Sequence, residues 1–419
     1  MPLRVPRLLL LLPTATYRAT AFVEAARAAG ADLTVASEEP STFEDAEPAN
    51  LVTLDLSNPD RAAAQARDFA RKYPLDGVLG VDDDTAVVAA AIATRLTLSG
   101  NPERAALAAR DKHLQRLTLA QAGVRVPAFA LHMLAEPAED VAAAVRYPCV
   151  IKPLRLAASR GVIRADDPRA FVAARARLAA ILAQPDIASC GEWAEQYLVE
   201  DFIAGSEVAL EGLATDGRLH VLAIFDKPDP LDGPFFEETI YVTPSRLPDA
   251  AQAAIAECAQ AAVTALDLRD GPIHAELRWN KEGAWLIELA ARPIGGRCSA
   301  ALRFGERGRG KGEWSLEEII VRHALGMDLP SLEREARPSG VMMIPVPRSG
   351  LLKEIRGQSD AVRVPGVDAV QLTITPGQTL TAWPEGSRYL GFIFSHGETP
   401  ELAEAALRAA HAKLDFTID

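Results

Sequence analysis

A pair of apolar runs joined by a tight turn constrains the fold of this 419-residue chain more than any other stretch of its sequence. The runs lie in HAELRWNKEGAWLIELAARPIGG, residues 274–296, on either side of a loop at Lys281–Gly283. A three-residue hairpin loop requires a left-handed residue, and Gly283 adopts that conformation without steric cost. We therefore predict an antiparallel hairpin with three facing pairs: Trp279 and Trp285, Leu277 and Ile287, and Glu276 and Glu288.

The two facing glutamates, Glu276 and Glu288, repel each other, because directly opposed side chains on a sheet start only ~5 Å apart. Alternation along the strands places Leu277 and Ile287 partly on the other face. The repulsion is relieved if one glutamate keeps a proton, or if a cation lies between the carboxylates, and hard oxygen ligands of this kind suit Mg²⁺. The hairpin alone also allows a register shifted by one residue, with both glutamates in water.

Composition excludes several classes of protein. Hydrophobic residues make up 49% of the chain and charged residues 24%, as in ordinary soluble enzymes and unlike disordered proteins. The formal net charge of −13 argues against a nucleic-acid partner, since such a protein needs a basic face to displace counterions. The four cysteines form no CxxC motif, which favours reduced thiols and a cytoplasmic location.

The leucine run Leu8–Leu12 follows two arginines, as in a secretory signal. The run is too short for the apolar part of such a signal, and no small-residue cleavage site separates it from the helical pattern that follows. Nothing later approaches the ~20 apolar residues of a membrane span. We interpret Leu8–Leu12 as a buried strand and expect no membrane partner.

The first hundred residues alternate strand and helix patterns, which is typical of an α/β domain with a parallel sheet. Strands are predicted at Leu8–Leu12, Asp32–Ser37 and Gly77–Val81, with a helix at residues 17–29. We interpret the acidic triplet Asp82–Asp84 as the cap of the next helix in preference to a metal site, because Asp is favoured at a helix start. No GxGxxG follows the first strand, so the dinucleotide fingerprint is missing.

The rest of the chain mixes helices and strands in an α+β pattern. A long helix is predicted from Asn101 to a stop at Gly123. A segment that looks like a linker follows the helix predicted at residues 315–326, and the remainder reads as a small separate α+β domain. We expect three domains, bounded at residues 1–105, 106–330 (with a subdomain at about 125–190) and 331–419.

One phosphate-binding motif is a false lead. Residues Gly305–Gly312 read GERGRGKG and match GxxxxGK. Gly312 stands where a P-loop needs Ser or Thr for Mg²⁺, and no strand directly precedes the motif. We predict a mobile basic loop at this position.

Four features together indicate a site for phosphate and carboxylate groups. Lys152 ends the strand pattern CVIKP, and a small-residue loop with Ser159 and Gly161 follows, whose backbone amides can approach phosphate oxygens. The glutamate pair of the hairpin is the third feature. The fourth is Arg292, whose planar guanidinium suits phosphate or carboxylate. Taken singly, each of these residues also fits a solvated or structural role.

These segments resemble those of the ATP-grasp ligases. HAELRWNKEGAWLIELAARPIGG is similar to their metal-binding hairpin, VIKPLRLAASRGV to their lysine strand and lid loop, RDKHLQR to an earlier lysine helix, and YLVEDFIAGSEVALEG to the strand that holds adenine. Within the superfamily the chain looks most like the L-amino-acid ligases that make dipeptides. That likeness lies in PTATYRATAFVEAARAAG, FDKPDPLDGPFFEETIYVTPS and PGQTLTAWPEGSRYLGFIFSHG.

The resemblance implies an ATP-grasp fold, with a Rossmann-like domain at 1–105, an ATP-grasp domain at 106–330 whose lid is the subdomain at about 125–190, and a C-terminal α+β domain. It implies that Glu276 and Glu288 bind Mg²⁺ or Mn²⁺. It further implies that Arg292 binds the acyl phosphate, and that Glu238, with Tyr241 beside it, binds a substrate ammonium. The residues implied to contact ATP are Lys112, Lys152, Ser159, Gly161, Val162, Glu200, Asp201, Phe202, Ile203 and Glu207.

The implied reaction activates a small-molecule carboxylate as an acyl phosphate, releases ADP, and joins the acyl group to an amine. The resemblance leaves the oligomeric state open and allows a homodimer. A biotin-carboxylase-like activator of bicarbonate and a degenerate ATP-binding regulatory protein are the alternatives. Many ATP-grasp enzymes have Glu-x-Asn where this chain has Glu288-Leu289-Ala290. Dipeptide ligases resemble this chain in lacking that asparagine. Tyr241 stands where some dipeptide ligases carry histidine, and Arg160 in the lid loop could contact phosphate or water.

Overall fold

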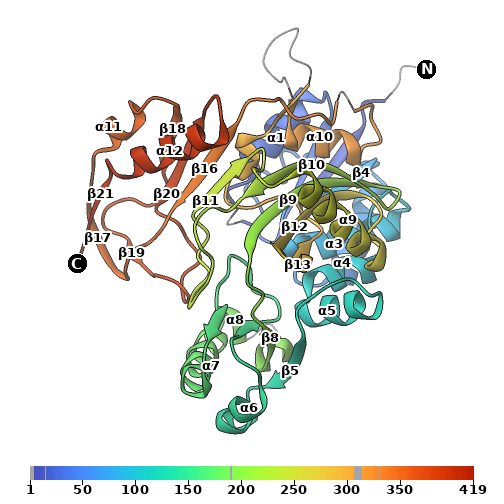
Figure 1. The fold of residues 1–419 in the computed structure, drawn as a ribbon. Helices are drawn as coiled ribbons and strands as arrows, with labels where there is room; N and C mark the ends of the chain where they lie inside the picture. The colour runs from blue at the N-terminus through green and yellow to red at the C-terminus, as the bar shows by residue number, and fades with distance from the viewer. Residues whose placement is uncertain (1–3, 15, 189–190, 306–313, 330) are drawn as a thin grey trace.

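The structure is a computed structural model that describes residues 4–14, 16–188, 191–305, 314–329 and 331–419. Figure 1 shows an N-terminal unit packed on a large central sheet, and a smaller unit around β5, α6 and α7 that projects from this body. The basic loop predicted at Gly305–Gly312 lies, beyond Gly305, outside the described residues. Among the described helices, none combines the length and the apolar character that a membrane crossing requires.

The N-terminal unit is a parallel sheet in the order β3-β2-β1-β4, as the strand and helix alternation predicts. Leu8–Leu11 are fully buried, because alternate residues face α1 and α10 on one side of the sheet and α2 and α3 on the other. Its elements are β1 Arg7–Leu11, α1 Ala19–Ala28, β2 Asp32–Ser37, β3 Leu51–Thr53, α2 Pro59–Ala70, β4 Gly77–Gly80 and α3 Asp83–Leu96.

The long helix predicted between Asn101 and Gly123 is two helices, α4 Glu103–Arg110 and α5 Lys112–Gln121. The break falls at Asp111, whose backbone is extended and whose side chain accepts hydrogen bonds from two amides of the first turn of α5. A helix-capping aspartate inside an otherwise helical pattern therefore starts a new helix. The consequence is that Lys112 becomes the first residue of α5.

The subdomain for which the resemblance implies a lid role, called the lid below, is a four-stranded antiparallel sheet in the order β5-β8-β6-β7, with helices packed on it. Its apolar core is formed mainly by β6, β8 and α7 and is separate from the other clusters of buried residues. The elements are β5 Phe129–Met133, α6 Ala138–Ala144, β6 Cys149–Pro153, β7 Ile163–Ala165, α7 Pro168–Leu182, α8 Pro185–Ala188, the 3₁₀ helix η1 Glu192–Glu195 and β8 Gln196–Asp201.

The central sheet has eight strands in the order β13-β12-β9-β10-β11-β16-β20-β18. One face packs against α9 and the other against the N-terminal unit and α10. The elements up to the linker are β9 Ser206–Thr215, β10 Arg218–Asp226, β11 Ile240–Thr243, α9 Asp249–Ala265, β12 Gly271–Asn280, β13 Gly283–Ala290, η2 Cys298–Ala301, β14 Arg303–Phe304, β15 Trp314–Ser315 and α10 Leu316–Ala324.

The C-terminal part contributes three strands to the same sheet and also forms a three-stranded sheet of its own, in the order β19-β17-β21. β16 pairs along its length with β11, across the boundary expected near residue 330, although the boundary itself stays a prediction. The elements are β16 Ser339–Ile344, β17 Gly350–Arg356, α11 Gln358–Val362, β18 Val367–Leu372, β19 Thr379–Leu380, β20 Gly391–His396, α12 Pro400–His411 and β21 Asp415–Ile418.

The hairpin of β12 and β13 has the predicted glutamate pair but a different register beyond it. Glu276 faces Glu288, whereas Leu277 faces Leu286 and Trp279 faces Ala284. The predicted pairs Leu277 with Ile287 and Trp279 with Trp285 are therefore wrong. A β-bulge at Ile287 inserts one extra residue, and the turn is correspondingly shorter, with Gly283 (φ +114°) already in the strand.

Candidate active site

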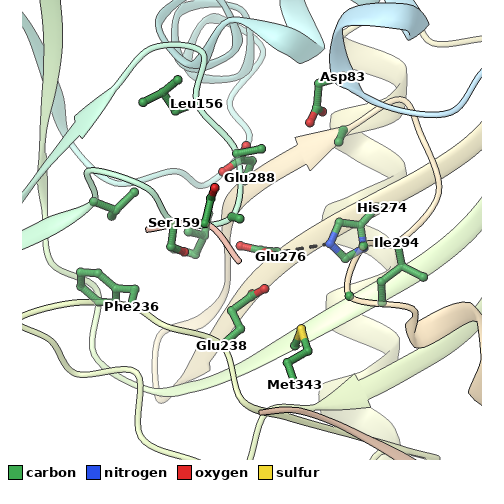
Figure 2. Close-up of a pocket in the computed structure, with 18 of the residues that line it drawn as sticks. Asp83, Leu156, Ser159, Phe236, Glu238, His274, Glu276, Glu288, Ile294 and Met343 are labelled. Carbon is green, nitrogen blue, oxygen red and sulfur yellow. Dashed lines mark ion pairs between the residues drawn. The ribbon is translucent and has the colours of Figure 1, made fainter. Parts of the chain in front are cut away.

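One face of the central sheet carries charged residues where the opposite face carries apolar ones. Along β12, Ala275 and Leu277 point into the core under α9, so the residues between and beside them, including Glu276, point to the other face. This face borders a cavity of about 1100 Å³, drawn in Figure 2. Its volume is at the upper end of ligand pockets, which hold roughly 300–1,000 Å³, so it has room for a nucleotide and small substrates.

The structure brings all but one of the predicted site residues to this cavity. Gly161 is the exception, because its amide donates a hydrogen bond to the carbonyl of Pro384 (3.0 Å) instead of facing the cavity. The predicted residues that line the cavity are Lys112, Lys152, Ser159, Val162, Glu200, Asp201, Phe202, Ile203, Glu207, Glu238, Tyr241, Glu276, Glu288 and Arg292.

The facing glutamates of the hairpin are each compensated by a lysine. The ammonium of Lys112 lies 3.0 Å from Glu288 Oε1, and that of Lys227 lies 3.3 Å from Glu276 Oε1. Burial alone would raise the pKa of Glu276, but the charges of Lys227 and His274 outweigh it and hold that pKa well below its ordinary value. Glu276 therefore stays ionised without a proton between the two carboxylates, and carboxylate oxygens of such a pair are ligands that suit a divalent cation.

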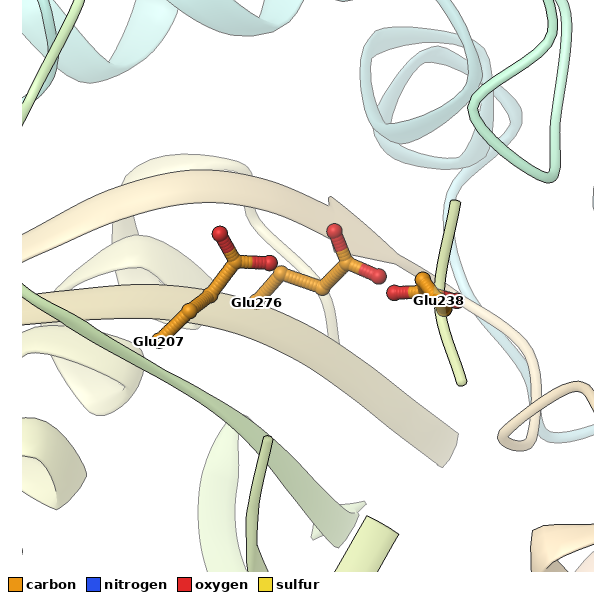
Figure 3. A group of neighbouring side chains, drawn as sticks. All are labelled: Glu207, Glu238 and Glu276. Atoms are coloured by element: carbon orange, nitrogen blue, oxygen red, sulfur yellow. The ribbon is translucent and has the colours of Figure 1, made fainter. Parts of the chain in front are cut away.

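Lys227 is the centre of a second acidic cluster. Its ammonium lies 2.9 Å from Glu207 Oε1 and also contacts Glu238 and Glu276, whose carboxylates are neighbours in Figure 3. The lysine side chain is 3% exposed, so it balances three carboxylates almost out of reach of solvent. Burial raises the pKa of Glu238 to about 7, although Lys227 opposes this shift. Tyr241 donates a 2.6 Å hydrogen bond to Glu238, as expected for neighbours.

The lid end of the cavity combines a buried ion cluster with an apolar slot. Lys152 and Arg116 both lie 2.7 Å from the carboxylate of Glu200, and all three side chains are at most 5% exposed. The side chain of Glu200 is thus held by cations, which leaves the backbone after β8 for the adenine contact that the resemblance implies. Apolar residues border the cavity beside it, namely Pro127, Val150, Phe202, Phe236 and Ile287.

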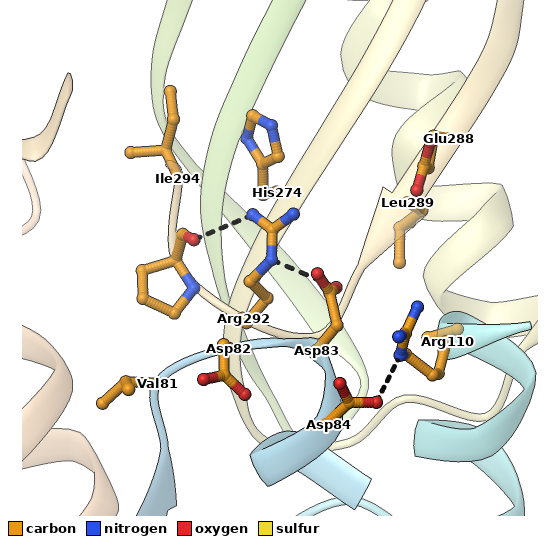
Figure 4. A network of polar contacts seen from close by, with 12 residues as sticks. Val81, Asp82, Asp83, Asp84, Arg110, His274, Glu288, Leu289, Arg292 and Ile294 are labelled. Carbon is orange, nitrogen blue, oxygen red and sulfur yellow. Dashed lines mark hydrogen bonds and ion pairs between the residues drawn. The ribbon is translucent and has the colours of Figure 1, made fainter. Parts of the chain in front are cut away.

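Arg292 is oriented by the acidic triplet of the N-terminal unit. Figure 4 shows its guanidinium between Asp83 Oδ1, 3.1 Å from Nε, and the carbonyl of Pro293, 3.1 Å from Nη1. Burial would raise the pKa of Asp83, but Arg292 and Arg110 outweigh it and lower that pKa to about 2. Asp82 accepts the capping bond from Thr85, as predicted, whereas Asp83 has an additional role that the capping interpretation did not include.

Three protein-family models match successive parts of the chain. They are the ATP-grasp N-terminal domain at residues 23–100, the ATP-grasp domain at 145–301, and the L-amino acid ligase C-terminal domain 2 at 342–419. The chain belongs to the ATP-grasp carboxylate–amine ligase superfamily.

Known relatives match this ATP-grasp ligase over different shares of its chain. An L-amino acid ligase from Bacillus licheniformis superposes with a TM-score of 0.77 at 26% identity, over 99% of each chain. Alanine–anticapsin ligase of Bacillus subtilis is 30% identical over 48% of this chain and 45% of its own length. Dapdiamide A synthase of Enterobacter agglomerans is 29% identical over 49% and 47%. The match therefore spans about half of each of these two relatives.

The lid loop of this ligase is docked on the C-terminal part. The indole of Trp383 donates to the carbonyl of Ala158 (2.9 Å), and Arg160 Nε donates to the carbonyl of Glu385 (3.2 Å). Arg160 also lies 3.3 Å from Asp186, so it links the lid loop both to α8 and to the segment at 383–385. Ala158 and Ser159 both have positive φ, which marks a tight turn facing the cavity.

Sequence reasoning missed three charged residues of this site, Asp83, Arg116 and Lys227. Signals for them existed. Asp83 follows a parallel strand at the sheet edge where ligands bind in α/β folds, and Arg116 lies four residues after Lys112, on the same side of α5. Lys227 directly follows β10, as a buried lysine that needs carboxylate partners.

Proposed function

We propose that this ATP-grasp ligase activates an L-amino acid as an acyl phosphate, with release of ADP, and joins it to the amino group of a second amino acid. Support comes from the juxtaposition of the facing glutamates, Lys112 and Arg292 in one cavity. The match of the C-terminal part to the L-amino acid ligases supports amino acids over bicarbonate. The presence of both hairpin glutamates, of Lys112 and Lys152 and of Arg292 in the cavity supports a catalytic role in preference to nucleotide binding alone.

In the first step a carboxylate oxygen of the donor substrate attacks the γ-phosphorus of ATP, and the bond to the β-phosphate oxygen breaks. Transferring a phosphoryl group to an anion requires charge neutralisation and alignment more than an acid or base. Lys112 and Lys152 reach the cavity with ammonium groups for phosphate oxygens. Glu276 and Glu288 would hold Mg²⁺ or Mn²⁺, which supplies further positive charge on the phosphates.

In the second step the amine nitrogen attacks the acyl carbon, phosphate leaves, and the amine loses a proton. Arg292, fixed by Asp83, would stabilise the developing oxyanion, since donors that are already oriented need no rearrangement during the reaction. Glu238 would hold the ammonium of a substrate, and its pKa of about 7 suits proton exchange near neutral pH. The docked lid loop would keep water from the acyl phosphate.

The test is a matrix of amino-acid pairs with ATP, scored by phosphate release, nucleotide analysis and mass spectrometry of the products. We expect ADP and a dipeptide for at least one pair, and a loss of at least roughly 100-fold in turnover for Glu276→Gln and Glu288→Gln with the fold retained. AMP as the main nucleotide product would contradict the mechanism. ADP formation that depends on bicarbonate, without an amino acid, would favour the biotin-carboxylase-like alternative.

A further inference from the structure

One fully buried carboxylate has no part in the mechanism proposed above. Glu211 of β9 lies between Ala209 and Leu213, two fully buried residues of the largest apolar cluster, on the same face of the strand. Burial raises the pKa of its carboxyl group. Among the described residues, no lysine or arginine lies within ion-pair distance, 4.0 Å, of it. A buried carboxylate without such a partner is costly, so a specific contact must explain its position.

That contact is with the loop that carries Arg292. The two carboxylate oxygens of Glu211 lie 3.2 and 3.1 Å from the backbone nitrogen of Ile294, whose N–H donates to them. Ile294 comes two residues after Arg292, and Figure 4 shows both on the loop that follows β13. β9 is an interior strand of the central sheet, between β12 and β10. The loop is therefore attached to the middle of the sheet by a side chain.

Glu211 and Asp83 act on different parts of the arginine loop. Asp83, at the start of α3 in the N-terminal unit, contacts the guanidinium of Arg292. Glu211, from the central sheet, holds the backbone two residues further on. The position of a guanidinium depends on its backbone as well as on its side-chain rotamer. Asp83 alone therefore does not fix Arg292 relative to the sheet.

His274 connects the same carboxylate to the glutamate pair. It faces Glu211 directly across the pairing of β12 with β9. Its Nδ1 lies 3.4 Å from Glu211 Oε2, and its Nε2 lies 3.7 Å from Glu276 Oε1, the contact that is dashed in Figure 2. One row of side chains thus runs from the amide of Ile294 to a glutamate expected to bind the metal.

We infer that Glu211 is a positioning residue, which holds the amide of Ile294 and thereby places Arg292 relative to Glu276. The inference rests on the proposed ligase function and deepens it, because it adds a residue on which amide formation depends. Glu211 does not line the cavity, so it acts through Arg292 and not on a substrate. The amide of Ile294 requires an acceptor rather than a charge, so a neutral acceptor of the same length should serve.

Three replacements of Glu211 separate positioning from folding. Glu211→Met keeps the length of the side chain but removes the acceptor, Glu211→Leu is a second apolar replacement, and Glu211→Gln keeps one acceptor oxygen. We expect all three to fold, because apolar residues often replace buried charged groups without loss of stability. Glu317→Met is the matched control, since Glu317 is buried on α10 outside the cavity. Failure to fold with either apolar residue would overturn the inference, because Glu211 would then be structural.

Steady-state kinetics with an amino-acid pair that is ligated provide the first test. The kcat for amide formation should fall roughly 10- to 100-fold in the methionine and leucine variants, since a misplacement of about 1 Å can cost that much. The KM for ATP should not change. Glu211→Gln and the control should stay within about threefold of the wild type, because no hydrogen bond to the loop is lost. A glutamine variant as slow as the methionine variant would overturn the inference.

A double variant tests whether Glu211 acts through Arg292. In an Arg292→Gln background, Glu211→Met should lower kcat no further, because residues that act as one unit have non-additive effects. If the two substitutions instead multiply their effects on kcat, Glu211 acts independently of the arginine and the inference is wrong.

Hydrogen exchange keeps this result separate from the proposed function. Exchange of the amides at residues 292–296 is followed by mass spectrometry without substrates, and Glu211→Met should speed it at least roughly tenfold, the factor for one hydrogen bond. Glu211→Gln should not. If the wild type ligates no pair but exchange is faster in Glu211→Met, the proposed function fails while Glu211 still holds the loop. Unchanged exchange in Glu211→Met would overturn the inference whether or not ligation occurs.

Discussion

At the scale of single residues, the charges around the cavity are balanced by lysines that form ion pairs with specific carboxylates. Lys227 is the clearest case, since its one ammonium lies among Glu207, Glu238 and Glu276. Three carboxylates within 4.8 Å of one another are also a group that could hold a metal ion. In this structure the ammonium of Lys227 lies among these three carboxylates, where a metal ion would otherwise bind. Glu288, the other glutamate of the hairpin pair, does not belong to this group.

Replacing Lys227 by methionine should lower the free energy of unfolding by about 3–5 kcal/mol at pH 8, because breaking a buried ion cluster leaves carboxylates without a partner. Lowering the pH to 6 should recover part of this loss. In the variant the carboxylates have pKa values raised by their mutual repulsion and by burial, which already raises that of Glu238 to about 7. A group with a raised folded pKa stabilises the fold at low pH and ceases to do so as the pH rises through that pKa.

Urea titrations of the wild type and the Lys227→Met variant at the two pH values measure this effect. Lys353→Met is the control, because Lys353 pairs with Asp419 at 3.4 Å and both side chains are about half exposed or more. Its substitution should cost no more than about 1 kcal/mol. A Lys227→Met variant as stable as the control at pH 8 would show that the three glutamates do not share a charge-balancing lysine in solution.

At the scale of elements, two local irregularities shape the site. The bulge at Ile287 lets both Ile287 and Glu288 line the cavity, although strict alternation would send one of them to the opposite face. The lid loop, with its two positive-φ residues, is held by the segment at 383–385 as well as by Asp186 of the lid. The lid loop and the C-terminal part are thus connected through Trp383, which also packs on Tyr389 with ring centres 4.8 Å apart.

Replacing Trp383 by phenylalanine should loosen the closed lid, because it removes the hydrogen bond to Ala158 while keeping an aromatic ring. We expect more acyl phosphate to be lost to water, so that ADP formed per amide product rises roughly two- to tenfold, the factor that corresponds to one hydrogen bond. Parallel measurement of ADP and product decides it. Trp314→Phe, at β15, is the control. An unchanged ratio in Trp383→Phe would mean that the indole contact does not govern closure.

At the scale of the whole molecule, the N-terminal and C-terminal parts meet in one cluster of buried residues, and the C-terminal strands extend the central sheet. The largest cluster of buried residues joins Leu8 of the N-terminal sheet to Met343 and Phe392 of the C-terminal part. The cavity likewise takes its walls from the N-terminal loop, the lid, the central sheet and the C-terminal strands. The cavity is therefore complete only with all of these parts, and the largest buried cluster only with both the N-terminal and the C-terminal part.

A chain ending at residue 337 should therefore not fold as a stable unit. It lacks β16, β20 and β18, which leaves β11 as an unpaired edge and exposes the residues that Met343 and Phe392 cover. We expect no cooperative thermal transition and no ATP binding, measured by circular dichroism and calorimetry against the full chain. Cooperative melting with retained ATP binding would restore the separate C-terminal domain that the sequence pattern predicts.

The sequence by itself determined what depends on near neighbours along the chain. Strand and helix periodicity predicted the parallel sheet, the capping of α3 by Asp82 followed from residue type, and the glutamate pair at Glu276 and Glu288 followed from a short hairpin. The resemblance of motifs then identified the superfamily. These inferences succeeded because hairpin pairing, caps and buried strands are fixed by local spacing and by conformational preference.

Only the tertiary structure decided which charges meet. A sequence shows that Asp83, Lys227 and Arg297 are charged, but it does not show their partners, which come from other parts of the chain. Asp83 pairs with Arg292, Lys227 pairs with three glutamates, and Arg297 lies near the rings of Tyr17 and Phe392. The same holds for the bulge at Ile287 and for the C-terminal strands that extend the central sheet. The physical reason is that electrostatic pairing and sheet edges depend on distance in space, whereas periodicity depends on spacing along one strand or helix.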